Sequence, residues 1–218
     1  MTARTLRFRS VVLDFDSTIS ALEGAEWIAA TLSPEVASVI AAEVDAAMAG
    51  TLALQDIYAG RMNVLRPDAR LLAELAGAYR AAVAPGTHEA LDHMRRAGVQ
   101  LRVVSGGFRE AILPVAVDLG FAPTEVHAVS IYTSPDGAYE GFDSASPLVQ
   151  QLGKSALVAS LDLPRPSLMV GDGATDAAAR PAVDAFAAFT GFARRGPVVA
   201  VADHVVHSFA VLEQLVLG

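Results

Sequence analysis

Two aspartates at alternate positions, Asp14 and Asp16, directly follow the apolar run at residues 11–13. Side chains two positions apart on an extended chain share a face, so these carboxylates are expected to lie close together. A bound cation or a shared proton would relieve their repulsion. Ser17 and Thr18 then supply small hydroxyls of the kind that cap a helix. The stretch indicates either a cation or acid–base site, or a strand end that turns through an Asx-type loop.

Two further polar clusters also follow predicted strands. The sequence S-G-G at 105–107 comes after the β-rich run 99–104, and G-D-G-A-T-D at 171–176 comes after the run 167–170. In an open parallel sheet, ligands bind beyond the carboxyl ends of the strands. The three clusters are therefore expected to converge on one crevice.

The residue types in these clusters suit phosphate chemistry. Ser105, with the backbone N–H groups of Gly106 and Gly107 at a predicted helix start, is expected to form a phosphate cradle. Lys154, at the start of its own predicted helix, adds a positive charge to the site, unless it is an ordinary exposed lysine. Several carboxylates without histidine or sulfur nearby in sequence suit a hard ion such as Mg²⁺. These carboxylates are Asp14, Asp16, Asp172 and Asp176.

Composition narrows the class of protein. The 218 residues are 53% hydrophobic, long enough for one sizeable core or for a core with a small insertion. A net charge of -8, without a cluster of Lys and Arg, argues against nucleic-acid binding. No apolar run approaches the roughly 18 residues of a membrane span. The absence of cysteine excludes disulfides and thiolate zinc sites. We expect a soluble cytoplasmic protein.

The elements that must position these residues fall into two kinds. Residues 21–79 show only helical patterning, with predicted helices at 23–32, 36–48, 54–65 and 69–82. From residue 85, helices and strands alternate, which predicts an α/β fold with a Rossmann-like, doubly wound parallel sheet. Residues 126–132 and 138–142 are predicted to form one antiparallel hairpin. We therefore predict a core domain of residues 1–20 and 81–218 and a helical-bundle cap domain of residues 21–80.

Taken together, these motifs resemble the haloacid dehalogenase superfamily of phosphohydrolases, and within it the phosphoserine phosphatase family. The matching stretches occur in the family's order and spacing and span essentially the whole chain. They are D-F-D-S-T from Asp14, V-S-G-G-F from Val104, Y-E-G-F-D from Tyr139, G-K-S from Gly153 and G-D-G-A-T-D from Gly171.

The resemblance implies a division of labour between the two opening aspartates. Asp14 would be the nucleophile that forms an aspartyl-phosphate. Asp16 would be the general acid for the leaving serine oxygen and then the general base for water, with the nearby phosphate and Asp14 favouring its protonated form. Asp172 would hold Mg²⁺ together with Asp14 and the backbone carbonyl of Asp16, while Asp176 orients that shell.

The resemblance also assigns the phosphate ligands. Ser105 and Lys154 would bind the transferring phosphoryl group, with Lys154 reducing repulsion between phosphate and carboxylates. Thr175 stands where relatives have a residue that helps bind phosphate or the metal shell.

Substrate specificity is expected to come from the segment that resembles the family's cap. Glu23 stands where relatives bind the substrate ammonium, and Arg61 where they bind its carboxylate. An Arg fork suits a carboxylate and a carboxylate suits an ammonium, so the pair would recognise a zwitterionic amino acid. On helix periodicity alone both residues would be surface or core positions.

The neighbouring cap pattern is partly kept. Met48 and Gly50 match the family, whereas Leu54 stands where some relatives have phenylalanine and Leu22 replaces an acid often found beside the glutamate. Leucine keeps an apolar wall, so we expect these departures to tune affinity more than to change the substrate.

The resemblance implies a Mg²⁺-dependent phosphoserine phosphatase that releases L-serine in the last step of serine biosynthesis. The alternatives are a related phosphatase or phosphotransferase acting on phosphohomoserine or phosphoethanolamine, and a non-catalytic phospho-ligand sensor. The expected partner is a small phosphomonoester, with no nucleic acid or membrane, and the chain would act as a monomer or homodimer.

Overall fold

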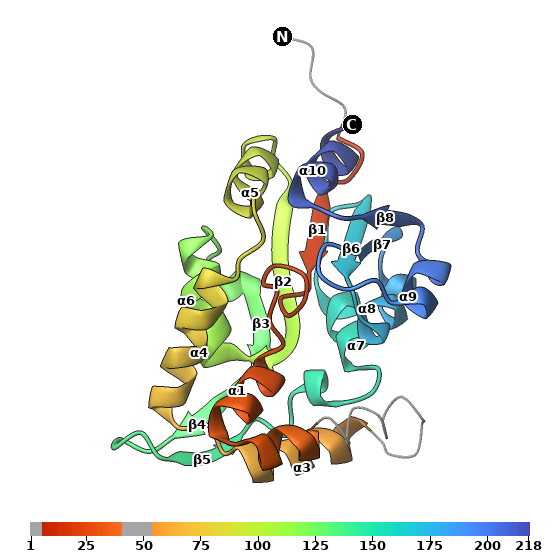
Figure 1. Cartoon of the computed structure of the whole chain (residues 1–218). Helices are drawn as coiled ribbons and strands as arrows, with labels where there is room; N and C mark the ends of the chain where they lie inside the picture. The colour runs from red at the N-terminus through yellow and green to blue at the C-terminus, as the bar shows by residue number, and fades with distance from the viewer. Residues whose placement is uncertain (1–5, 41–53) are drawn as a thin grey trace.

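A six-stranded parallel sheet forms the centre of the protein (Figure 1). The structure, a computed structural model, describes residues 6–40 and 54–218, without the side chains of 54–56. The strands are ordered β3-β2-β1-β6-β7-β8, so the opening strand lies in the middle. They are β1 (Ser10–Leu13), β2 (Gln100–Phe108), β3 (Val126–Val129), β6 (Ser167–Gly171), β7 (Ala185–Phe189) and β8 (His204–Val206).

Helices cover both faces of this sheet. Val11 and Leu13 of β1 pack into a core with α5, α6 and α10, whereas Val12 packs on the opposite face with Val158 of α7 and Val198 of α9. This alternation is what a buried strand imposes. The helices are α5 (Thr87–Arg96), α6 (Arg109–Asp118), α7 (Gly153–Ser160), α8 (Ala174–Ala178), α9 (Gly196–Val201) and α10 (Phe209–Leu217). The predicted doubly wound α/β class is confirmed.

The segment after β1 is helical, with α1 (Gly24–Leu32), α3 (Leu54–Leu65) and α4 (Ala69–Ala81), and residues 34–40 are also helical. Ser33 and Asp68 act as caps, accepting from Val36 N at 3.2 Å and from Leu71 N at 2.7 Å. Figure 1 shows α1 and α3 beyond the carboxyl ends of the strands, whereas α4 packs beside α6 at the flank of the sheet. The division into core 1–20 and 81–218 and cap 21–80 stays a prediction.

The predicted hairpin 126–132/138–142 is wrong in its first half. β3 joins the parallel sheet beside β2, and the chain then leaves it to form β4 (Ile131–Thr133), which pairs with β5 (Tyr139–Phe142). The Glu110 carboxylate accepts from Ile131 N at 2.8 Å, so this N–H is not available to continue the ladder of β3. The contact is long-range, and hydrophobic alternation alone could not show it.

Two other boundaries differ from the sequence prediction. β2 continues through the S-G-G stretch to Phe108, with a register shift against β3 between Val104 and Phe108. Such a shift is typical of a β-bulge, which glycine tolerates. Thr87, a residue type that favours the cap position, is instead the first residue of α5, and Gly86 at φ 76° occupies the cap position. The helix α9 was not predicted, because its valines disfavour helix in isolation; burial of Val198 offsets this preference.

Candidate active site

The central position of β1 places Asp14 at the carboxyl edge of the sheet. Its backbone N–H donates to Val170 O of β6 at 2.9 Å, which continues the ladder one residue beyond the strand. The Asp14 carboxylate is buried and accepts from Phe15 N at 2.8 Å through Oδ1. Lys154 Nζ lies 2.9 Å from the same oxygen. Asp14 is therefore held in one orientation by a backbone donor and a cation.

Lys154 joins two buried carboxylates. Its Nζ donates to Asp176 Oδ1 at 2.6 Å, and Gly173 N donates to Asp176 Oδ2 at 2.9 Å. Burial lowers the pKa of the Lys154 ammonium, but the charges of Asp14 and Asp176 outweigh it and leave the pKa above its ordinary value. Burial and the charge of Asp14 raise the pKa of Asp176 to about 8. Any side chain at Gly171 would overlap the Asp176 carboxylate, so glycine is required there.

Asp14, Asp172 and Asp176 form a group that fits a divalent cation. One carboxylate oxygen from each lies within 4.8 Å of the others, and all three residues are buried. Burial raises the pKa of Asp172 and of Asp176, and the Asp14 charge raises both further, so a cation among them would relieve real repulsion. An all-oxygen donor set suits a hard ion. The side chain of Asp16 is not part of this group.

The Asp16 carboxyl is instead directed toward the cap helix α4, where the Tyr79 hydroxyl donates to its Oδ1. Burial raises the pKa of Asp16 well above its ordinary value, and the charge of Glu23 raises it further. Asp14 also raises this pKa but contributes less. The protonated form that an acid catalyst needs is thus favoured, although mainly by desolvation and not by the neighbouring aspartate.

The S-G-G stretch lies beside Asp14 at the end of β2. Gly107 N donates to the Ser105 hydroxyl at 3.0 Å. The helix predicted to follow this stretch is present as α6, which begins at Arg109 with Phe108 in the cap position. A Cβ on Gly107 would lie 2.9 Å from Asp16 Oδ2 and 2.9 Å from Ile112 Cδ1, so only glycine fits without displacement. The site therefore offers a bulged strand end where backbone approaches Asp16 closely.

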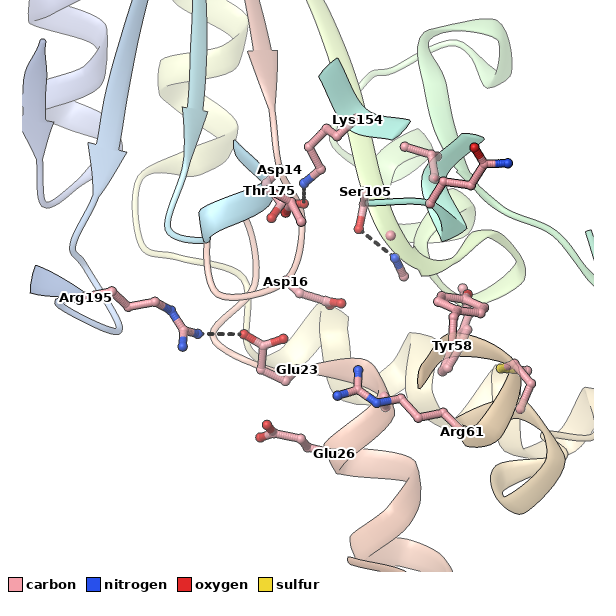
Figure 2. A pocket seen from close by; sticks show the side chains of 17 residues that line it. Asp14, Asp16, Glu23, Glu26, Tyr58, Arg61, Ser105, Lys154, Thr175 and Arg195 are labelled. Carbon is pink, nitrogen blue, oxygen red and sulfur yellow. Dashed lines mark hydrogen bonds and ion pairs between the residues drawn. The ribbon is translucent and has the colours of Figure 1, made fainter. Parts of the chain in front are cut away.

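A pocket of about 300 Å³ joins these groups to the helical segment. Figure 2 shows Asp14, Lys154 and Ser105 at one side, Glu23 and Arg61 at the other, and Asp16 between them. The lining residues predicted from sequence are Asp14, Asp16, Glu23, Arg61, Ser105, Gly106, Gly107, Lys154 and Thr175. Met48 and Gly50 lie outside the described residues, as does the side chain of Leu54.

Comparisons with known proteins place the chain in a family. Residues 8–184 match the family model for haloacid dehalogenase-like hydrolases. The chain is 31% identical to phosphoserine phosphatase of Rattus norvegicus over 185 residues, which are 84% of this chain and 81% of that protein. It is 30% identical to phosphoserine phosphatase of Bos taurus over 206 residues, covering 93% and 91%. The chain belongs to the phosphoserine phosphatase family of the haloacid dehalogenase-like hydrolases.

The solved structures show the same fold. A phosphoserine phosphohydrolase-like protein from Francisella tularensis superposes with a TM-score of 0.84 at 23% identity, covering 95% of this chain and 99% of that one. The sequence relatives show that the protein is a phosphatase. The structural neighbour shows that it has the same type of sheet with flanking helices. None of the helices in the described part of the chain has the length and hydropathy of a membrane span.

Sequence reasoning did not anticipate Arg195 and Tyr58, which line the pocket, or Tyr79, which contacts Asp16 from outside the pocket lining. Arg195 Nη2 donates to Glu23 Oε1 at 3.2 Å (Figure 2), and its Nε donates to Asp172 Oδ2 at 2.8 Å, which connects the acidic cluster to the cap. Tyr79 donates to Asp16. The Tyr58 hydroxyl is buried at the pocket and has no hydrogen-bond partner among the described residues. In sequence the tyrosines look like core positions of amphipathic helices and Arg195 like part of a solvated loop.

Proposed function

We propose that this phosphatase hydrolyses phosphoserine to serine and phosphate through an aspartyl-phosphate on Asp14. One observation carries the proposal: a nucleophile oriented by Lys154 and a strand-end cradle at Ser105 face the same pocket as Glu23 and Arg61. The first group suits a phosphate ester, and the second suits an amino acid. The names of the relatives point to the same substrate.

The reaction would proceed in two steps on this chain's own residues. Asp14 attacks phosphorus while Asp16 donates its proton to the leaving serine oxygen. Water then attacks the aspartyl-phosphate, and Asp16 takes up the proton. Ser105 and Lys154 bind the phosphoryl oxygens, and Lys154 offsets their charge beside two carboxylates. Thr175, at the pocket wall, is placed to contact the same group.

Mg²⁺ is the proposed metal, held by Asp14, Asp172 and Asp176 and by the backbone carbonyl of Asp16. When bound there it supplies positive charge that offsets the charges of phosphate and carboxylates. Asp172 is oriented for this role by its hydrogen bond from Arg195.

Recognition of the amino acid would fall to Glu23 and Arg61. Burial raises the pKa of Glu23 to about 7, so the side chain is about half ionised at neutral pH and the carboxylate predominates above it, where it can meet an ammonium. Ser17 donates to its Oε1 at 2.7 Å and fixes its direction. Arg61, on α3, supplies a guanidinium at the same end of the pocket for the substrate carboxylate.

A pair of truncated substrates tests this assignment. Phosphoethanolamine is phosphoserine without its carboxylate, and 3-phosphooxypropionate is phosphoserine without its amine. Arg61→Ala is expected to lower kcat/KM about tenfold to a hundredfold for phosphoserine and 3-phosphooxypropionate, but not for phosphoethanolamine. Glu23→Gln is expected to lower kcat/KM for phosphoserine and phosphoethanolamine, but not for 3-phosphooxypropionate. Equal losses on both truncated substrates would refute amino-acid recognition by these residues.

Product analysis with an added alcohol distinguishes the proposed hydrolase from a phosphotransferase. If Asp14 passed the phosphoryl group to an alcohol such as homoserine, added homoserine would yield a phosphorylated product and less free phosphate. The proposed hydrolase releases one phosphate for each serine regardless of added alcohol.

A further inference from the structure

Tyr79 lies where the helical segment meets the sheet domain. It is in the last turn of α4, and its side chain is fully buried. The ring packs edge-on against Phe15, with centroids 4.9 Å apart and an interplanar angle of 82°. The backbone on both sides is also held, because Ala21 N donates to Ala82 O and Ala84 N donates to Ile19 O, each at 2.9 Å. The hydroxyl therefore has little freedom to move.

The two oxygens of the Asp16 carboxyl have different surroundings. Oδ1 accepts from the Tyr79 hydroxyl. Oδ2 faces Gly107, since a Cβ built on that glycine would lie 2.9 Å from it. Figure 2 shows Asp16 extending into the pocket between Asp14 and the cap residues. One oxygen thus contacts the protein interior, and the other is directed toward the cradle.

From this geometry we infer that Tyr79 is a positioning residue for the acid–base step: by donating to Oδ1, its hydroxyl confines the Asp16 proton to Oδ2, facing the cradle. The inference rests on the proposed function, in which Asp16 is the acid. An oxygen that accepts from a phenol presents a lone pair to it, so in the neutral carboxyl the proton resides on the other oxygen. Tyr79 itself does not touch the substrate.

Each half of the reaction moves one proton through Asp16 Oδ2. The Asp14 oxygen–phosphorus bond forms as the bond from phosphorus to the alcohol oxygen breaks, and the proton on Asp16 Oδ2 goes to that oxygen. In the second half, a water oxygen bonds to phosphorus, its proton goes to Asp16 Oδ2, and the Asp14 oxygen–phosphorus bond breaks. Throughout, the Tyr79 hydroxyl keeps its proton and fixes the carboxyl plane.

A neighbouring glycine supports the importance of this placement. A Cβ on Gly24, the first residue of α1, would collide with the Tyr79 hydroxyl and lie 3.1 Å from Cζ. Gly24 has no positive φ, so backbone conformation does not require glycine there. Glycine is required at this position because the Tyr79 hydroxyl approaches it closely. Gly24→Ala would thus displace the hydroxyl without removing it, and it would also disturb the hydrogen bond between the Gly24 backbone and Asp16.

The test compares leaving groups, because an acid matters for an alkoxide and hardly matters for a stable anion. We would measure kcat/KM, which reports the steps up to release of the leaving group, for phosphoserine and for acetyl phosphate, a small activated phosphate. Tyr79→Phe keeps the ring and removes the hydroxyl. It is expected to lower kcat/KM for phosphoserine about tenfold to a hundredfold and that for acetyl phosphate less than about threefold.

Two further variants complete the experiment. Gly24→Ala is expected to shift the ratio of the two kcat/KM values in the same direction as Tyr79→Phe. Tyr132→Phe, which removes a hydroxyl from a side chain 50% exposed on β4, is the matched control and should leave both values unchanged. Circular dichroism checks that each variant is folded.

Equal losses on both substrates would show that Tyr79 only supports the fold, and no loss would show that it is dispensable; either result overturns the inference. Failure of the proposed function is a separate outcome. If the wild-type protein did not hydrolyse phosphoserine, that function would be refuted, and phosphoethanolamine would supply the alkyl ester for the Tyr79 comparison.

Discussion

Replacing Lys154 by methionine should strongly destabilise the protein. The lysine side chain is 7% exposed and contacts two carboxylates, Asp14 at 2.9 Å and Asp176 at 2.6 Å. Methionine has similar length but no charge, so the variant leaves both acids in the same buried volume without a cation. Removing one partner of a buried ion pair typically costs about 3–5 kcal/mol in free energy of unfolding. For a domain of this size, that corresponds to a fall in Tm of roughly 6–20 °C.

The loss should depend on pH with a definite sign. Asp176 has a pKa raised to about 8 in the folded protein, so its contribution to stability is present at low pH and is lost as pH rises through that value. Without Lys154 the pKa of Asp176 rises further, and the same loss becomes larger and extends to higher pH. The difference in stability between wild type and Lys154→Met should therefore stay nearly constant below about pH 8, where Asp176 is protonated in both proteins, and grow as pH rises above that value.

Chemical denaturation in the presence of a chelator measures this difference, since a divalent ion could otherwise replace the lysine. Two controls define the cause. Asp176→Asn in the Lys154→Met background should restore part of the stability, giving a favourable coupling in a double-mutant cycle. Arg70→Met breaks an exposed pair with Glu74 and should change stability by less than about 0.5 kcal/mol. A pH-independent loss, or no recovery with Asp176→Asn, would refute the electrostatic explanation.

Three other predictions concern the pocket. The pKa of Glu23 is about 7, so its carboxylate ionises between pH 6 and pH 8. The KM for phosphoserine, measured by steady-state kinetics, should therefore fall over this range. The KM of Glu23→Gln should not change with pH in this way. Gly107→Ala places a methyl 2.9 Å from Asp16 Oδ2 and should lower kcat/KM about tenfold or more, whereas Gly77→Ala, where a Cβ meets nothing within 4 Å, should not. Mg²⁺ at a hundred times its Kd should stabilise the wild type by about 2.7 kcal/mol in thermal unfolding, and Asp172→Asn should abolish this gain.

Much of the fold could be predicted from local patterns in the sequence. Ser33, whose type and place before Pro34 and Glu35 favour a helix cap, does cap the helix at residues 34–40, and the sheet class is confirmed. The three polar clusters meet because parallel strands share a carboxyl edge, so their proximity follows from topology. Prediction failed where a long-range contact decides the structure, as at Ile131, whose N–H is taken by the Glu110 carboxylate.

The same limit applies to the pocket. Residues whose roles follow from motif spacing, such as Asp14 and Lys154, could be proposed from sequence, and their roles stay proposals. Tyr79 is separated from Asp16 by 63 positions, and Arg195 from Glu23 by 172. Neither side chain has a local pattern that distinguishes it from a core tyrosine or a surface arginine. Only the folded chain brings them to the acids.

The central claim is that an aspartyl-phosphate forms on Asp14. Chemical trapping of this intermediate is the most direct test. The protein would be mixed with phosphoserine and Mg²⁺, quenched in acid, and treated with borohydride, which reduces an aspartyl-phosphate to homoserine. Peptide mass spectrometry should then find homoserine at position 14 in the wild type and not in Asp14→Asn, which should also release no phosphate. Phosphate release by Asp14→Asn at the wild-type rate, or homoserine at another aspartate, would contradict the mechanism.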